Sequence, residues 1–204
     1  DVPWVLDGDA AWYALQALSL FRDGVANPFG YGGNSQPVPS IALGGLAMLV
    51  SGPTIAALRF PWAVIGTAAV GASWLLFRRI LGPRLGLAAS ALLATWHFHV
   101  HYSRVGLNNV ADTLVLTLVL LGFVRALGSA SARDWFLAGS AAGAGLLGYT
   151  GAWMAPPLLF GLTFFIQSDN QAKKGKDFKA RFAWRLLLLF CFGLLNSLFY
   201  QGDI

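Results

Sequence analysis

A polar stretch interrupts the apolar sequence between residues 97 and 112, which read HFHVHYSRVGLNNVAD. It holds three His, one Arg, two Asn and one Asp, and the apolar run TLVLTLVLLGFV follows directly. Ionisable groups at the edge of a membrane-spanning segment are costly and are functional candidates by default. Asp112 is therefore a candidate for substrate or ion binding.

Two local structures are compatible with this stretch. A helix that ran through it without a break would include Gly106. That helix would put Arg104, Asn108 and Asp112 on one face, because they are spaced four residues apart. If the helix begins later, Asn109 is the N-cap and Asp112 its partner at the third helical position, as in a capping box. The sequence leaves both structures open.

The histidines suggest either metal binding or a membrane interface. His97 and His101 are four residues apart, so a helix would place both on one face and His99 nearly opposite. A helix could thus offer two ligands to a metal but not three. An aromatic belt at the membrane surface is the favoured interpretation. Three aromatic residues alternate with the histidines: Trp96, Phe98 and Tyr102.

A second acidic site lies near the start, in VLDGDAAWYA, where Asp7 and Asp9 precede an amphipathic segment. One interpretation is helix capping, in which either carboxylate accepts first-turn N–H groups and is favoured by the helix dipole. The other is acid–base chemistry. The local pattern does not decide between them.

Outer arginines and aromatic residues provide candidate lipid contacts. Arg59 and Arg104 are interpreted either as interfacial anchors or as phosphate ligands, since a guanidinium binds phosphate through paired charge-assisted hydrogen bonds. Tyr149 and Trp153, in GYTGAW, are interpreted either as interface aromatics or as part of a donor-binding site.

Composition fixes the broad class of the protein. Hydrophobic residues make up 56% of the 204 residues, charged residues only 11%, and the mean hydropathy is +0.61. Such a chain is an integral membrane protein. Its single cysteine, Cys191, excludes an internal disulfide framework. The net charge of +5 does not indicate nucleic-acid binding, because the basic residues lie between apolar segments and not in an aromatic-rich patch.

Lipid cannot satisfy free backbone groups, so we predict an all-α fold, a polytopic membrane bundle. About 20 apolar residues cross the hydrocarbon region as a helix. About six spans are expected: 56–78, 85–102, 109–127, 134–151, 153–168 and 185–200. We expect the natural N-terminus to precede Asp1, since no signal-peptide pattern opens the chain.

Residues 1–54 are predicted to form an extracytoplasmic loop, and residues 55–204 the transmembrane bundle. Within the loop, residues 10–22 have amphipathic spacing suited to the bilayer surface. Residues 37–50, PVPSIALGGLAMLV, are apolar but short and contain two adjacent glycines. A re-entrant or interfacial helix is expected there.

Basic residues predict the orientation. Strict alternation of the spans puts three basic loops on one side, which the positive-inside rule makes cytoplasmic. These loops hold eleven of the fourteen Lys and Arg residues: Arg78, Arg79 and Arg84; Arg125 and Arg133; Lys173, Lys174, Lys176, Lys179, Arg181 and Arg185. The 97–112 turn is then extracytoplasmic, and we expect the protein in a plasma membrane, the bacterial inner membrane.

The order of these features over residues 1–165 resembles the N-terminal half of the GT-C membrane glycosyltransferases. Within that class the chain is most similar to the superfamily of protein O-mannosyltransferases and lipid A aminoarabinose transferases. The most specific pieces are LFRRILGPRLGLAASALLA and HYSRVGLNNVAD. The resemblance implies a GT-C-like fold, a polyprenyl-phosphate sugar as donor, and transfer on the extracytoplasmic side.

The resemblance also implies residue roles. Asp9 matches the acid that takes the acceptor proton, but Ala10 stands where the family usually has Glu, and Asp7 is a possible substitute. Asp112 would orient the acceptor, a sugar or a divalent cation. Tyr149 fits a later Tyr motif, whereas Trp153 stands where members often carry Arg. We expect Asp9 and Asp112 to face one outer cavity.

Two rival functions remain. Ala10, Trp153 and the end of the sequence at Ile204 favour a catalytically inactive, glycosyltransferase-like subunit with a structural role among other membrane subunits. A transporter is the third hypothesis, although the chain lacks paired broken helices in matching halves.

Overall fold

Helices form all the regular structure in the residues that the computed structural model describes, namely 8–23, 37–129 and 131–172. They are α1 (Gly8–Asp23), α2 (Val38–Ser51), α3 (Ile55–Ile80), α4 (Pro83–Thr95), α5 (His97–Tyr102), α6 (Val110–Ser129), α7 (Ala132–Gly145), the 3₁₀ helix η1 (Thr150–Met154) and α8 (Ala155–Ala172). Their contacts divide the chain into two units, Asp1–Leu159 and Phe160–Ile204. The prediction of an all-α fold is confirmed for the described residues.

Two of these helices, α3 and α6, are long and apolar enough to cross a membrane. At 1.5 Å per residue, their 26 and 20 residues correspond to about 39 and 30 Å, enough for a hydrocarbon core of about 30 Å. They coincide with the predicted spans 56–78 and 109–127. The predicted span 185–200 lies outside the described residues.

Two of the other predicted spans, 85–102 and 134–151, are broken or shorter in the structure, whereas 153–168 appears as the 18-residue helix α8. The segment 85–102 is interrupted at Trp96, whose extended backbone separates the 13 residues of α4 from the six of α5. Helix α7 has 14 residues and is followed by η1, where one span over 134–151 was expected. Adjacent Pro156 and Pro157 fit the start of α8, because proline is tolerated in the first helical turn.

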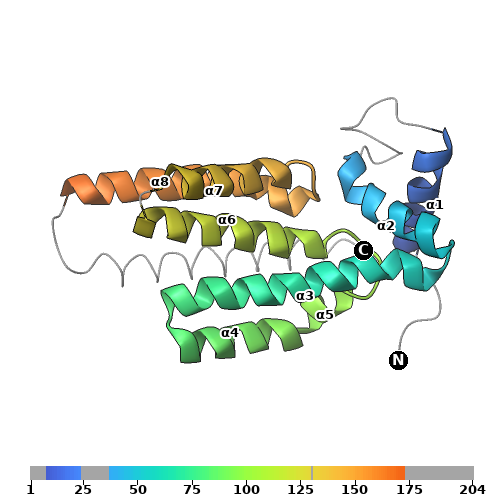
Figure 1. Cartoon of the computed structure of the whole chain (residues 1–204), viewed down its shortest axis with the longest axis horizontal. Coiled ribbons are helices and arrows are strands. Elements are labelled where there is room, and N and C mark those ends of the chain that lie inside the picture. Colours follow the sequence, from blue (N-terminus) through green and yellow to red (C-terminus); the bar gives the residue numbers. More distant parts are fainter. Residues whose placement is uncertain (1–7, 24–36, 130, 173–204) are drawn as a thin grey trace. The chain divides into compact units, whose positions relative to one another are not determined.

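Helices α3 and α6 run parallel and pack through small residues (Figure 1). Ser73 Oγ lies 3.5 Å from Thr117 Oγ1, with both side chains buried. At the start of α6, Val110 packs against Gly66 of α3, where an added Cβ would lie 3.3 Å from the Val110 side chain. Both contacts join residues 44 apart in sequence, so the two helices keep one register. Small residues permit such close approach of membrane helices.

Helices α4 and α7 pack outside this pair, α4 against α3 and α7 against α6. Added Cβ atoms would lie 2.6 Å from the backbone nitrogen of Arg78 at Gly86, and 3.0 Å from Ala138 at Gly122. Each outer helix follows its partner after two residues, and arginines lie in the helices on either side: Arg78, Arg79 and Arg84 beside one connection, Arg125 and Arg133 beside the other. Because α3 and α6 are parallel, these arginines lie at the same end of the pair.

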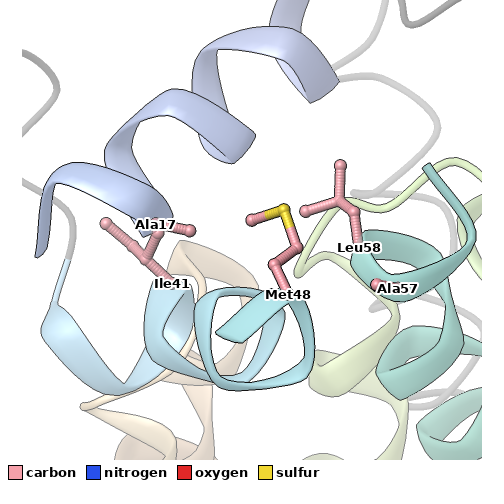
Figure 2. Close-up of a cluster of buried hydrophobic side chains, with 5 residues drawn as sticks. All are labelled: Ala17, Ile41, Met48, Ala57 and Leu58. Atoms are coloured by element: carbon pink, nitrogen blue, oxygen red, sulfur yellow. The ribbon is translucent and has the colours of Figure 1, made fainter. Parts of the chain in front are cut away.

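Helices α1 and α2 pack near the start of α3. Figure 2 shows the cluster that joins them, in which Ala17 of α1 meets Ile41 of α2, and Met48 extends toward Leu58 of α3. At Gly45 an added Cβ would lie 2.7 Å from the carbonyl oxygen of Ala17, so glycine permits the approach of α2 to α1. Helix α2 therefore connects α1 to the long helices. Its re-entrant or interfacial placement stays a prediction, as does the domain division at residue 54.

Large apolar side chains cover the outer surfaces of the helices. Phe60 of α3 is 68% exposed, Leu92 of α4 is 71% exposed and Phe136 of α7 is 72% exposed. A soluble protein rarely leaves so many large apolar groups in water. These helices therefore present a surface suited to lipid.

Candidate functional site

The loop between α5 and α6, residues 103–109, sets the start of α6. Gly106 has a φ of +85°, a left-handed conformation that glycine adopts readily. The first helical hydrogen bonds run from the N–H of Ala111 to the carbonyl of Asn108 and from Asp112 to Asn109. The helix thus begins after Asn109, and the alternative of one helix through Gly106 is wrong.

Asp112 occupies the third position of α6, but its carboxylate is directed at the η1 segment. It accepts hydrogen bonds from the backbone N–H groups of Gly151 and Ala152. Its Oδ1 atom is buried and has no hydrogen-bond partner in the described part of the chain. Buried carboxylate oxygens are rarely left unsatisfied, so this atom stays a candidate for binding a polar group.

The first turns of α1 dock on the 103–109 loop. Ala10 is fully buried in a cluster with Val105 and Leu107, and Tyr13 packs against the same cluster. Asp9 lies in the first turn of α1 and is exposed. An acid in a first turn also interacts favourably with the helix dipole, so the capping interpretation is compatible with this position. Asp7 lies outside the described residues.

Tyr13 interacts with both candidate acids. Burial is the strongest influence on its phenol, and together with the neighbouring Tyr149 and the charges of Asp9 and Asp112 it raises the phenol's pKa to about 12, whereas Asn108 acts in the opposite direction. The phenol is therefore neutral at physiological pH. Coulomb interactions weaken with distance, so the residues that act on the Tyr13 phenol lie in its vicinity. They come from α1, the 103–109 loop, α6 and the segment before η1.

The side chain of Asn108 is the buried polar centre of this group, with an exposed fraction of only 1%. Its Nδ2 and Oδ1 atoms have no hydrogen-bond partner among the described residues. A carboxamide has two donors and an acceptor with two lone pairs, so most of its hydrogen-bonding capacity is unused. The site therefore holds two underused polar side chains, Asn108 and Asp112, one helical turn apart.

The two candidate arginines differ in their surroundings. Arg59 is buried, at 8% exposure, and its Cγ atom lies 3.3 Å from where a Cβ on Gly106 would be, so it adjoins the 103–109 loop. Arg104 lies within that loop and is exposed. Neither is among the groups that act on the Tyr13 phenol. Their role toward a phosphate stays a prediction.

The histidines have different environments. The rings of His97 and His101 stack with centroids 6.1 Å apart, and both residues are exposed. His99 is buried, and its Nε2 lies 3.1 Å from the carbonyl oxygen of Gly66, which ties α5 to α3. The described residues contain no group of three or more His, Cys, Asp or Glu side chains that could hold a metal ion. Metal binding by His97 and His101 stays a prediction.

The family of the chain follows from a comparison with protein families. Residues 35–195 match the family described as dolichyl-phosphate-mannose-protein mannosyltransferase. The chain belongs to this family. The resemblance inferred from the sequence motifs is thereby confirmed. No curated protein and no solved structure matches the chain.

Membership of the mannosyltransferase family gives the site its setting. The family is of the GT-C membrane glycosyltransferase type, is membrane-embedded, and uses a polyprenyl-phosphate-linked sugar donor. The matched region includes Asp112 and Tyr149 but begins after Asp9 and Tyr13. The α1 part of the site therefore depends on the structure and on the sequence motif.

Sequence reasoning did not identify Tyr13 as a site residue, and it considered Asn108 only within a possible helical face. A signal for Tyr13 was present, because it lies four residues after Asp9 and shares its helix face. The approach of Tyr13 to Asn108 had no such signal, since the two residues are 95 positions apart in the sequence.

Proposed function

We propose that the chain transfers a sugar from a polyprenyl-phosphate donor to an acceptor on the extracytoplasmic side of a membrane. The observation that carries this proposal is the docking of the first turns of α1, which carry Asp9, on the loop that leads to Asp112, with the charges of both acids acting on the Tyr13 phenol. Family membership supports the donor class. Two acids from distant segments beside one polar centre are the parts that such a transfer needs.

In the proposed reaction, the acceptor hydroxyl oxygen attacks the anomeric carbon of the sugar. The bond from that carbon to the phosphate oxygen breaks, and the polyprenyl phosphate leaves with the bonding electrons. Asp9 takes the hydroxyl proton as general base. Asp112, whose Oδ1 has no hydrogen-bond partner among the described residues, orients the acceptor, a sugar or a divalent cation.

The leaving phosphate carries negative charge and needs neutralisation. Arg59 and Arg104 are the proposed cationic groups, since guanidinium groups bind phosphate oxygens in pairs. Tyr149, which lies near Tyr13, is proposed to contact the donor. An apolar surface on the neighbouring helices suits the prenyl chain, which explains why a sugar transferase should be built from membrane helices.

The arrangement of charges supports the proposed side of action. Arg79 and Arg125 lie toward the ends of α3 and α6, at one end of that helix pair, whereas Asp112 lies at the start of α6, at the other end. By the positive-inside rule, the arginine end faces the cytoplasm. The acids then face the extracytoplasmic side, and we propose the bacterial inner membrane as the location.

A second candidate function is supported by Ala10. The family usually carries Glu after the acid that aligns with Asp9, but Ala10 is fully buried between Val105 and Leu107. A carboxylate in that position would lose its hydration, so the structure accommodates Ala and not Glu there. This favours a catalytically inactive, glycosyltransferase-like subunit of a larger membrane complex.

The two functions are separated by donor turnover. Membranes that contain the full chain are incubated with polyprenyl-phosphate mannose carrying labelled mannose, and the label that leaves the lipid is measured. If the chain is a transferase, D9N should lower the rate by at least about a hundredfold, the usual contribution of a general base. D23N is the matched control, because Asp23 lies at the other end of the same helix. No turnover above that of membranes lacking the chain would favour the subunit.

A further inference from the structure

Three arginines gather where α3 is followed by α4. Arg78 and Arg79 lie in the last turn of α3, and Arg84 lies in the first turn of α4, after a connection of two residues. All three are exposed. The two helices approach closely here, because a Cβ added at Gly86 would lie 2.6 Å from the backbone nitrogen of Arg78. The three arginines, named here the arginine patch, therefore start from neighbouring points on the surface.

The charge of the arginine patch is not neutralised within the described part of the chain. The sequence contains no acidic residue between Asp23 and Asp112. Among the described residues, no ion pair includes a member of the patch. The connection between α6 and α7 differs, since Arg125 Nε lies 3.5 Å from Asp134 Oδ1. The arginine patch is therefore the more favourable of the two places for an anion from outside the chain.

Trp74 holds one of these arginines at the helix surface. The guanidinium carbon of Arg78 lies 4.6 Å from the centroid of the Trp74 ring, a cation–π contact across one turn of α3. The planar set of N–H donors in a guanidinium suits paired hydrogen bonds to phosphate oxygens. Because both residues are exposed, a phosphate can reach Arg78 without a rearrangement of the helices.

Exposed apolar side chains adjoin the arginine patch on both helices. Leu85 and Leu87 of α4 are 64% and 62% exposed, and Trp74 and Leu75 of α3 are each 36% exposed. Tryptophan favours the boundary between headgroups and hydrocarbon, and α3 is long enough to cross a membrane. A ligand that contacts both the arginines and these side chains carries an anionic group and an apolar chain. An anionic phospholipid has both.

We propose that the arginine patch and Trp74 bind the phosphate of an anionic phospholipid in the leaflet at this end of α3. Basic clusters at a membrane surface attract anionic lipids, and the bound lipid ties the α3–α4 connection to the headgroup layer. Asp112, at the start of α6, lies toward the opposite end of the α3–α6 pair (Figure 1). The lipid site is thus separate from the candidate transfer site, and the inference does not rest on the proposed function.

The test measures lipid binding to the full chain in detergent by native mass spectrometry. The chain is titrated with phosphatidylglycerol and with phosphatidylcholine of the same acyl chains. An arginine near a membrane surface contributes about fivefold to the binding of anionic lipid. We therefore expect phosphatidylglycerol to bind at least about tenfold more tightly than phosphatidylcholine. R78Q/R79Q/R84Q should remove this preference and leave the affinity for phosphatidylcholine unchanged.

Single variants provide the matched controls. R78Q should weaken phosphatidylglycerol binding about fivefold, whereas R133Q, which removes one exposed arginine beside the α6–α7 connection, should change it less than about twofold. W74L should weaken it about two- to fivefold through loss of the cation–π contact. W135L should have little effect, because Trp135 packs edge-on against Phe123, with ring centroids 5.6 Å apart. W74L keeps all three charges, so it tests the site even if the triple variant fails to fold.

Three results would overturn the inference. The first is equal affinity for the two lipids in the unaltered chain. The second is an equal loss in R78Q and R133Q, which would show a general attraction to positive charge. The third is displacement of phosphatidylglycerol by excess inorganic phosphate, which would identify the ligand as a soluble phosphate and not a lipid.

Discussion

Replacing Gly151 with Ala should displace the Asp112 carboxylate. A methyl group at Gly151 would lie 3.2 Å from Asp112 Cγ and closer still to Oδ2. Gly151 is not among the left-handed glycines, so alanine adds no backbone strain there. The carboxylate must therefore turn away from the two N–H groups that hold it, those of Gly151 and Ala152.

The expected size of the effect follows from these hydrogen bonds. Hydrogen bonds to a charged group contribute about 1.5–3 kcal/mol each. With partial recovery from water, the loss of two amounts to about 3 kcal/mol. If Asp112 acts in this geometry during transfer, G151A should lower the rate of donor turnover by about a hundredfold.

The assay compares G151A with G148A, which adds the same methyl group three residues earlier. A Cβ at Gly148 would lie 3.3 Å from the carbonyl oxygen of Gly145 but 4.0 Å from Asp112 Oδ1, an ordinary contact, so G148A should leave the carboxylate in place and retain turnover within about threefold. In a D112N background, G151A should have little further effect. Full activity in G151A, or equal losses in both variants, would refute the reasoning about Asp112.

Three further predictions concern other parts of the chain. In an alkaline titration followed by absorbance at 295 nm, the unaltered chain should show one phenol that ionises near pH 12, well above an ordinary tyrosine, and Y13F should lack that phenol. If Y13F instead lacks a phenol that ionises near pH 10, Tyr13 is not buried as described. If His97 and His101 bind a divalent metal, H97A/H101A should abolish Ni²⁺ binding measured by calorimetry, whereas unchanged binding would exclude the pair. G122L should lower the free energy of unfolding by about 1–3 kcal/mol, because the larger side chain overpacks against α7. G71L, on an open face of α3, should have no such effect. Equal effects of the two variants would contradict the close α6–α7 contact.

Much of the fold could be predicted from apolar length and local helix signals. Segments 56–78 and 109–127 are long apolar runs, and both appear as helices of matching extent. Helix α6 begins after Asn109, as the second of the two structures considered for residues 97–112 predicts. The break at Trp96 was not predicted, because no Gly or Pro between residues 87 and 105 marks it.

The site could be predicted only in part. Asp9 and Asp112 were identified because an acid near an apolar segment is unusual, and Tyr13 interacts with both, although a shared cavity stays a prediction. The hydrogen bonds from Gly151 and Ala152 to Asp112 depend on the return of the chain after α7. Such contacts between distant segments have no signal in residue type or spacing.

The central claim is that Asp9 and Asp112 lie beside one another at a single site. The most direct test replaces both with cysteine in the full chain with Cys191→Ser and applies a thiol cross-linker of about 10 Å, a spacing at which two carboxylates serve one sugar in glycosidases. Peptide mass spectrometry should find the D9C/D112C pair cross-linked within one chain. D23C/D112C should stay unlinked, because Asp23 lies about 21 Å farther along α1. Absence of the D9C/D112C link, or equal linking of both pairs, would contradict the account.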